Sequence, residues 1–339
     1  MRLQAFFSTL LMLFTCSTSF AELGSRSFAL STLISESDAI VVGKVKDTAV
    51  LNRSEYQIGF VIDKSISGST PSGILTISVP LSKGFRDPHA AYLEVDNRSL
   101  LLFLKHQADF NKWVIVNGQA GVLPGETNQD IAQIVQIHSR YDGLIDKEVV
   151  QALQALQAQF WTLGEVTKNR LLIDFEKGIS AEDTDFLVSL LSSDTERLQS
   201  FAALQVGSHK IAALRADVEN LLQVSPESQV QFHCLAGLGR LGSAESLDVV
   251  LRYLNSPDPG LRKAAIHAAG FIGGSEIVTP LVERYGIEDQ KWHRLAIIEA
   301  IERVPDVERA REVLTAFKTG EDDPLLTSMI SRRLTRLEQ

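Results

Sequence analysis

The spacing of apolar residues changes once along the chain, from a period of two to a helical period. In residues 39–115 apolar and polar side chains alternate, as in the run from Gln57 to Asp63, and turn residues separate the runs. This alternation predicts β-strands. From Thr127 onward apolar residues recur every three or four positions, which predicts amphipathic helices. We therefore expect a β part followed by a helical part.

The β part contains several short apolar runs, as a small barrel or sandwich requires. A short helix is expected before them, over residues 27–37. The turn-rich segment 83–89 is either a binding loop or, as we favour, a solvated connection between strands. The layout resembles the OB-like or netrin-like barrels at the front of some exported bacterial proteins. The expected strands lie within residues 39–45, 57–63, 75–79, 100–104 and 113–115.

The helical part repeats itself. Residues 230–242 align with residues 261–273 at an offset of 31, and the match continues into the helix that follows each segment. A further 31 residues on, Leu295-Ala296 take the places of Ala264-Ala265. A fixed period of about 20–50 residues predicts a solenoid of stacked helix pairs. Small residues recur at one position of the first helix, where we expect neighbouring helices to cross: Cys234, Ala265 and Ala296.

One repeat has a recognisable sequence. The segment 258–273 begins Asp-Pro-Gly-Leu-Arg-Lys-Ala-Ala and ends in a run of small residues. It resembles the HEAT repeat of the type named after phycobilisome lyases. The resemblance is specific over residues 228–289 and extends to 194–227 and 290–338. It implies a right-handed α-solenoid of about five repeats.

The resemblance also implies a contact between repeats, in which Asp258 and Arg262 help to lock neighbours together. Gln231 and His293 stand where the other repeats would need the arginine, so this ladder is expected to be incomplete. Helix starts are predicted from Asp258-Pro259, because an acid at the N-cap and a proline at the first helical position both favour initiation. Similar starts are expected at Ser180, Ser193 and Ser225.

These patterns predict an α+β protein with two domains, a small β-barrel or sandwich followed by an α-solenoid of HEAT-like repeats. Residues 1–21 are expected to be a signal peptide and residues 22–126 the β-rich domain. Residues 127–180 form a helical connector, and residues 181–339 form the solenoid.

The charge is concentrated in the helical part. The chain has a formal net charge of −9, and from Thr127 onward it carries 31 acidic and 22 basic residues. Binding to nucleic acid depends on a basic surface that neutralises phosphates. We therefore expect no nucleic-acid partner, and a protein partner that offers a basic patch.

Motifs that suggest chemistry have simpler structural interpretations. The sequence Gly-Leu-Gly-Arg-Leu-Gly at 237–242 has the spacing of a dinucleotide fingerprint, but a helix rather than a strand is predicted before it. His233 and Cys234 are neighbours on a helix and point in different directions. We predict no catalytic residue, no metal site and no cofactor. Three tryptophans on apolar stripes are expected in the core: Trp113, Trp161 and Trp292.

The predicted function is a non-enzymatic scaffold that binds another protein through the solenoid, because solenoids present long surfaces. The alternative is a lyase or an accessory factor that acts on another enzyme, as in some relatives of this repeat type. Tyr253 is the preferred anchor, since an exposed aromatic beside charges is typical of an interface. The outward positions of the second helices are the candidate contacts: Asp248, Arg252, Tyr253, Thr279, Glu283 and Glu308.

The start of the chain has the features of a secretory signal. Arg2 precedes an apolar run over residues 6–14, and small residues Ser19 and Ala21 occupy the positions that a signal peptidase reads. The run is too short to span a membrane, and no transmembrane segment is predicted elsewhere. Lipidation at Cys16 is the alternative. We expect a periplasmic or secreted protein.

The mature protein should begin at Glu22. Cleavage after Ala21 leaves small residues at both recognition positions, so intact-mass measurement of exported material should find a single N-terminus at Glu22. A species that begins with a lipidated Cys16 would contradict this prediction.

Overall fold

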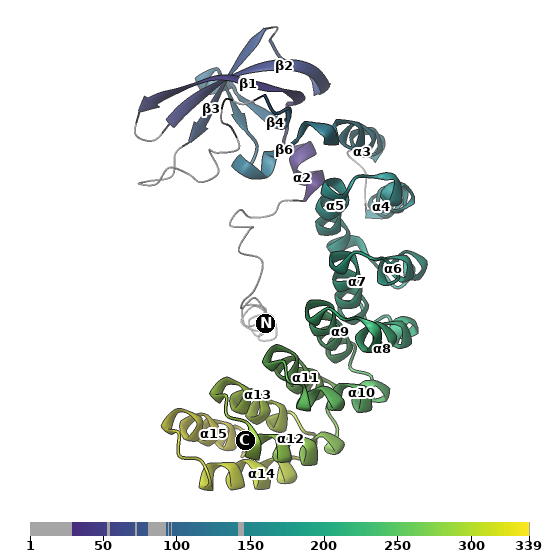
Figure 1. Ribbon diagram of the computed structural model, residues 1–339, viewed down its shortest axis with the longest axis vertical. Helices are drawn as coiled ribbons and strands as arrows, with labels where there is room; N and C mark the ends of the chain where they lie inside the picture. The colour runs from purple at the N-terminus through teal and green to yellow at the C-terminus, as the bar shows by residue number, and fades with distance from the viewer. Residues whose placement is uncertain are drawn as a thin grey trace. The chain divides into compact units, whose positions relative to one another are not determined.

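The computed structural model describes residues 29–52, 55–71, 73–80, 93, 95, 97–141 and 146–338. The predicted signal peptide and the loop 83–89 lie outside the described residues. The chain divides into two compact units at Gly178 and Ile179. Unit 1 contains the strands and the helices that follow them, and unit 2 contains the remaining helices (Figure 1). Each unit is described by itself below.

Unit 1 is built on a closed five-stranded barrel. The hydrogen-bonded order is β1-β2-β3-β5-β4, and β4 pairs again with β1 to close the ring. Strands β3 and β5 are parallel and the other pairs are antiparallel. The expected barrel is therefore confirmed, and the sandwich alternative is wrong. The strands are β1 (Ala39–Asn52), β2 (Glu55–Gly68), β3 (Ile74–Pro80), β4 (Leu100–Gln107), β5 (Lys112–Ile115) and β6 (Val122–Pro124), which pairs antiparallel with β4.

The barrel core follows from the alternation in the sequence. Every second residue of β2 points inward, so Ile58 and Phe60 are fully buried. The apolar run of β4 is buried from Leu101 to Leu104, because this strand is covered on both faces. Trp113 packs against this core as expected.

Helices complete unit 1. The helix α2 (Leu30–Ser35) precedes the barrel and α3 (Asn128–Tyr141), α4 (Asp146–Gln159) and α5 (Glu165–Gly178) follow it. The carboxylate of Asp174 on α5 accepts hydrogen bonds from the first two backbone N–H groups of α2, at 2.9 and 3.1 Å. This contact satisfies donors that a helix leaves free at its N-terminus.

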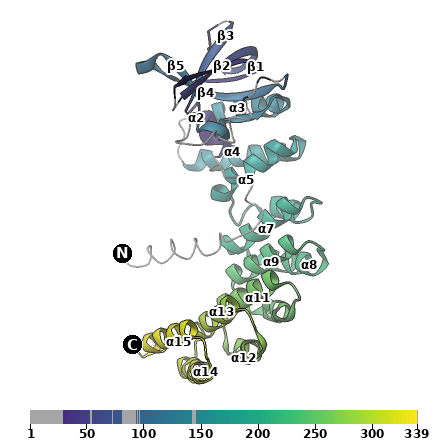
Figure 2. The ribbon, with the colours of Figure 1, turned by 60° about the vertical axis from the view of Figure 1, so that its left-hand side comes forward.

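Unit 2 is a two-layered stack of helix pairs, as the repeats predict (Figures 1 and 2). The first helices of successive pairs contact one another, and each second helix packs behind them. The stack bends with the first helices on the inner side of the bend. The first helices are α7 (Glu196–Ser208), α9 (Ser228–Leu241), α11 (Pro259–Ile272), α13 (Lys291–Glu302) and α15 (Pro324–Leu337). The second helices are α6 (Thr184–Leu191), α8 (Arg215–Val224), α10 (Leu247–Arg252), α12 (Val278–Ile287) and α14 (Val307–Thr319).

Glycine and alanine set the distance between the first helices. A Cβ on Gly237 would lie 2.2 Å from the carbonyl oxygen of Ala203 on the preceding first helix, and one on Gly239 would lie 2.7 Å from the Cα of Ala268 on the next. Cys234 and Ala265 are fully buried, as expected. The closest contacts between neighbouring first helices, however, are made at Gly237 and Gly239. The 237–242 motif is therefore a helix-packing motif, and Gly242 ends α9 in a left-handed conformation.

A side-chain oxygen shapes the start of each first helix. Ser193, Ser225 and Ser256 each accept a hydrogen bond from the backbone N–H two residues on, just before the helix begins. Glu288 and Glu321 do the same in the next two repeats. The expectation that Ser180, Ser193 and Ser225 are N-caps is wrong, because Asp183, Thr195 and Glu227 occupy those positions. The prediction for Asp258 is confirmed: its carboxylate accepts from the N–H groups of Gly260 and Leu261.

The register of the fourth repeat is 32 residues, not 31. Asp258 caps α11 and Gln290 stands at the N-cap of α13, so Arg294 rather than His293 corresponds to Arg262. The sequence alignment missed the extra residue because Ala296 follows an apolar residue and can be aligned with either Ala264 or Ala265. His293 is buried, with its Nδ1 3.4 Å from the carboxylate of Glu288.

The lock between repeats is an arginine of one repeat and a buried glutamate of the next. Arg262 reaches Glu288 at 3.4 Å, and Arg294 reaches Glu321 at 3.2 Å. Arg284 also binds Glu288, at 2.7 Å. The ladder therefore continues at α13, where the sequence predicted a gap at His293, with glutamate in place of Asp258 as the partner. At Gln231 the side-chain amide donates instead to the carbonyl oxygens of Leu222 and Ser225, so no ion pair forms there.

The free energy of unfolding at low pH should depend on the interactions of Glu288. Burial opposes the charge of Glu288, but hydrogen bonds from the Gln290 N–H, Arg284 and Arg262 outweigh it and lower its pKa from 4.5 to about 2. Because the pKa is lower in the folded protein, this stabilisation is complete above pH 4.5 and is lost as the pH falls towards 2. Glu288→Gln should therefore reduce the free energy of unfolding by about 3 kcal/mol at neutral pH, and by progressively less below pH 4.5.

Urea denaturation at several pH values measures the difference. The exposed Glu283→Gln on α12 is the control, and should change stability by less than about 0.5 kcal/mol at every pH. A pH-independent deficit in Glu288→Gln would show that its charge is not what locks the repeats.

Candidate functional site

The predicted contact residues lie along the second helices. Asp248 and Arg252 are on α10, Thr279 and Glu283 are on α12, and Glu308 is on α14. All five are exposed. They therefore share one surface, the second-helix face, which we define as the solvent-facing side of α8, α10, α12 and α14.

Tyr253 is not the exposed anchor that the sequence suggested. Its side chain is half-buried, and its hydroxyl donates a hydrogen bond to the carbonyl oxygen of Leu222 at 2.8 Å. The chain tightens into a 3₁₀ turn over Tyr253–Asn255, which turns the ring towards the preceding repeat. Burial raises the pKa of the Tyr253 hydroxyl, so it remains a donor. Tyr253 joins two repeats and presents only part of its ring.

Arg252 and Tyr253 border an open hollow on the second-helix face. Its volume is about 520 Å³. One wall comes from the end of α8 and the other from α10 and the loop after it. The complete lining is Gln223, Val249, Arg252, Tyr253, Asn255, Ser256 and Pro257. No sequence pattern predicts this hollow, because it forms only where two repeats meet.

The charges of the second-helix face are partly paired. Glu308 binds Arg311 on the same helix at 2.8 Å and remains 77% exposed. Asp248 and Glu283 are exposed acids on neighbouring helices. The six predicted residues thus contribute three carboxylates and one guanidinium to this surface.

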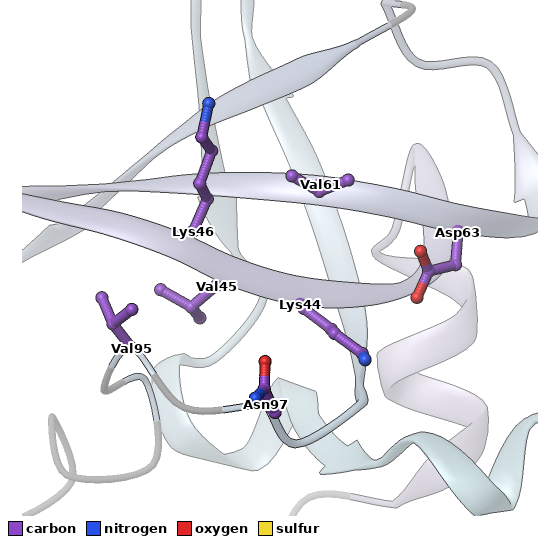
Figure 3. Close-up of a pocket in the computed structure, with 7 residues that line it drawn as sticks. All are labelled: Lys44, Val45, Lys46, Val61, Asp63, Val95 and Asn97. Atoms are coloured by element: carbon purple, nitrogen blue, oxygen red, sulfur yellow. The ribbon is translucent and has the colours of Figure 1, made fainter.

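A second hollow lies on the barrel, beside strands β1 and β2 (Figure 3). Its volume is about 490 Å³. The side chains of Lys44 and Asn97 lie on one side of the strands, whereas Lys46 points away from Asn97. The lining residues are Lys44, Val45, Lys46, Val61, Asp63, Val95 and Asn97. This hollow is lined by two lysines, an aspartate, an asparagine and three valines, and by no histidine, cysteine or serine.

Burial keeps the thiol and the imidazole in the middle of α9 neutral. Burial raises the pKa of the Cys234 thiol to about 12 and lowers the pKa of His233 to about 4. Both groups are therefore neutral near pH 7, and the thiol is a poor nucleophile. Within the described ranges, no three histidine, cysteine or carboxylate side chains gather as metal ligands would.

Two of the three tryptophans are on the surface, contrary to expectation. Trp161 is 46% exposed, and Lys168 lies 5.4 Å from the centre of its ring. Trp292 is 62% exposed at the start of α13. Both follow the apolar period of a helix, but the period does not show whether a neighbouring helix covers the position.

A comparison with protein-family models agrees with the helical architecture of unit 2. Residues 216–302 match the family model described as HEAT repeats, so unit 2 contains HEAT repeats. No curated protein sequence matches the chain. An engineered protein is 18% identical with a TM-score of 0.36, over 61% of this chain and 96% of its own. A second engineered protein is 18% identical with a TM-score of 0.40, over 64% and 65%. Human deoxyhypusine hydroxylase in complex with glycerol is 16% identical with a TM-score of 0.35, over 56% and 75%.

Tyr253→Phe should reduce the free energy of unfolding by about 1 kcal/mol, the net contribution of a typical hydrogen bond. The substitution removes only the hydroxyl that Leu222 accepts from. The exposed neighbour Arg252→Ala is the matched control and should change stability by less than about 0.5 kcal/mol. Urea denaturation of both variants gives the comparison; an unchanged midpoint for Tyr253→Phe would mean that the hydroxyl does not tie the two repeats.

Proposed function

We propose that this protein is a non-enzymatic scaffold that binds another protein through its HEAT repeats. The observation that carries the proposal is the stack of unit 2, which presents two long helical surfaces rather than one enclosed cavity. Such repeats contact only their neighbours, so the exposed sides of successive helices combine into one extended surface. A surface of this kind suits a protein partner better than a small molecule, which needs a concave site.

The second-helix face is proposed to meet a basic patch on the partner. Asp248, Glu283 and Glu308 place carboxylates on three successive second helices. An acidic surface steers a basic partner during encounter and selects against acidic ones. Arg252 and the exposed edge of Tyr253 would then provide the polar and aromatic contacts beside the hollow.

Export is part of the proposal, with cleavage after Ala21 and action in the periplasm or outside the cell. The support is the signal-like sequence at residues 1–21. None of the helices in the described ranges combines the length and apolar character needed to cross a bilayer.

Partner recovery followed by titration tests the function. The mature chain is used to isolate a partner from periplasmic or secreted extract, and the purified partner is titrated with variants. Asp248→Lys with Glu283→Lys should weaken binding at least tenfold, because two attractive charges become repulsive. Higher salt should weaken binding of the wild type.

The matched control reverses two exposed acids in the loops between repeats, Asp289→Lys with Asp322→Lys, and should stay within twofold of wild type. Equal loss in both variants would mean that net charge, not this face, determines binding. A chemical change in the partner after incubation would instead favour the lyase or accessory-factor alternative.

A further inference from the structure

The opposite side of the solenoid has a different chemistry. On α11, Lys263, His267 and Phe271 follow one another at intervals of four residues, so they lie along one side of the helix. Ala268 faces the preceding first helix and Gly270 faces the next one. The stripe lies between these two directions, on the side away from the second helices. We call this side of the first helices the first-helix face.

Equivalent positions on the other first helices follow from the structural register. Each repeat contributes one residue near the start of its helix, one or two in the middle and one near the end. The stripes are Arg197 and Leu204 on α7; Gln229, Phe232, Ala236 and Arg240 on α9; Trp292, Leu295, Glu299 and Arg303 on and just after α13; and Leu325, Ser328, Arg332 and Arg336 on α15.

Basic side chains dominate this face although the chain as a whole is acidic. The described stripes contain one carboxylate, Glu299, and Arg333 binds it at 2.7 Å. The neighbouring Glu302 is likewise held by Arg333 and Arg336. Most other acids of unit 2 lie at helix starts and in loops, such as Asp258 and Asp323. The basic members of the stripes are Arg197, Arg240, Lys263, Arg303, Arg332 and Arg336.

Exposed apolar surface accompanies the charge. Trp292 is 62% exposed and Leu325 is 44% exposed, at the starts of the adjacent helices α13 and α15. At the other end of the helices, the guanidinium of Arg303 lies 4.7 Å from the centre of the Phe271 ring. The face thus has an apolar edge and a cationic edge.

His267 lies in the middle of the stripe on α11, near Lys263 and Arg303. Burial, together with the nearby Lys263, Arg303 and His293, lowers the pKa of His267 to about 4. The imidazole is therefore neutral near pH 7. It adds a polar contact and no charge to the surface.

We propose that the first-helix face binds an acidic protein segment that carries aromatic or aliphatic side chains. Carboxylates of the segment would pair with Lys263, Arg303 and their neighbours, and its apolar side chains would cover Trp292 and Leu325. A protein segment fits better than nucleic acid, because the exposed apolar edge of Trp292 and Leu325 offers nothing to a phosphate. This inference rests on the proposed scaffold function and adds a second surface of opposite charge.

Fluorescence anisotropy with three labelled probes tests the inference on the full mature chain. The probes are an acidic peptide of Glu and Asp with Leu and Phe, the same peptide with Gln and Asn in place of the acids, and a single strand of twenty thymidines. The acidic peptide should bind at least tenfold more tightly than either of the others, and its affinity should fall with salt.

Charge reversal then locates the site. Lys263→Glu with Arg303→Glu should weaken the acidic peptide at least tenfold. Arg309→Glu with Lys318→Glu, which makes the same change in net charge on exposed residues of α14, should stay within twofold. Circular dichroism should show the same helicity in both variants.

Three results would overturn the inference: no preference for the acidic peptide, equal loss in both double variants, or tighter binding of the thymidine strand through Lys263 and Arg303. The proposed scaffold function is judged separately, by partner binding to the second-helix face. If the acidic peptide does not bind but the partner still binds the second-helix face, only this inference is rejected. If neither binds, the proposed scaffold function is rejected as well.

Discussion

Close contact between the first helices is the constraint on which unit 2 depends. Gly237 and Gly239 let the backbones of neighbouring helices meet at distances that any Cβ would prevent. Because the contact is backbone to backbone, it uses only the two lateral sides of each helix. One remaining side packs on the second helices and the other is left to solvent. The first-helix face is therefore a direct consequence of how the repeats stack.

The buried glutamates connect neighbouring repeats of this stack. Glu288 and Glu321 each bond the backbone before a first helix and also receive an arginine from the preceding repeat. A buried carboxylate is costly unless it is paired and hydrogen-bonded, and here both conditions hold. In earlier repeats a serine makes the backbone contact alone. The last repeats are thus joined by charge as well as by packing, which fixes their register.

Acidic and basic residues lie on different parts of each repeat, so the net charge of the chain does not describe the charge of its individual surfaces. Carboxylates gather where helices begin, because the N-terminal end of a helix favours negative charge. Arginines and lysines gather on the first-helix face, and Arg240, Arg284 and Lys318 lie in last helical turns, where the dipole favours cations. An acidic total of −9 therefore coexists with a basic surface. For a scaffold, the local surface potential, and not the sum, decides which partner it accepts.

The sequence alone determined the elements and their order, because local periodicity and helix signals depend on neighbouring residues. It correctly predicted the barrel, the HEAT-like repeats, the Asp258 cap and the burial of Cys234 and Ala265. The tertiary structure alone decided which side of an apolar stripe is covered and which residue meets the next repeat. Tyr253 turned inward and Trp292 remained exposed. Arg294 makes the contact with the next repeat at the place where the sequence alignment had put His293. Each of these outcomes depends on contacts between repeats about 30 residues apart, and a one-residue change in a loop alters them without changing the local pattern.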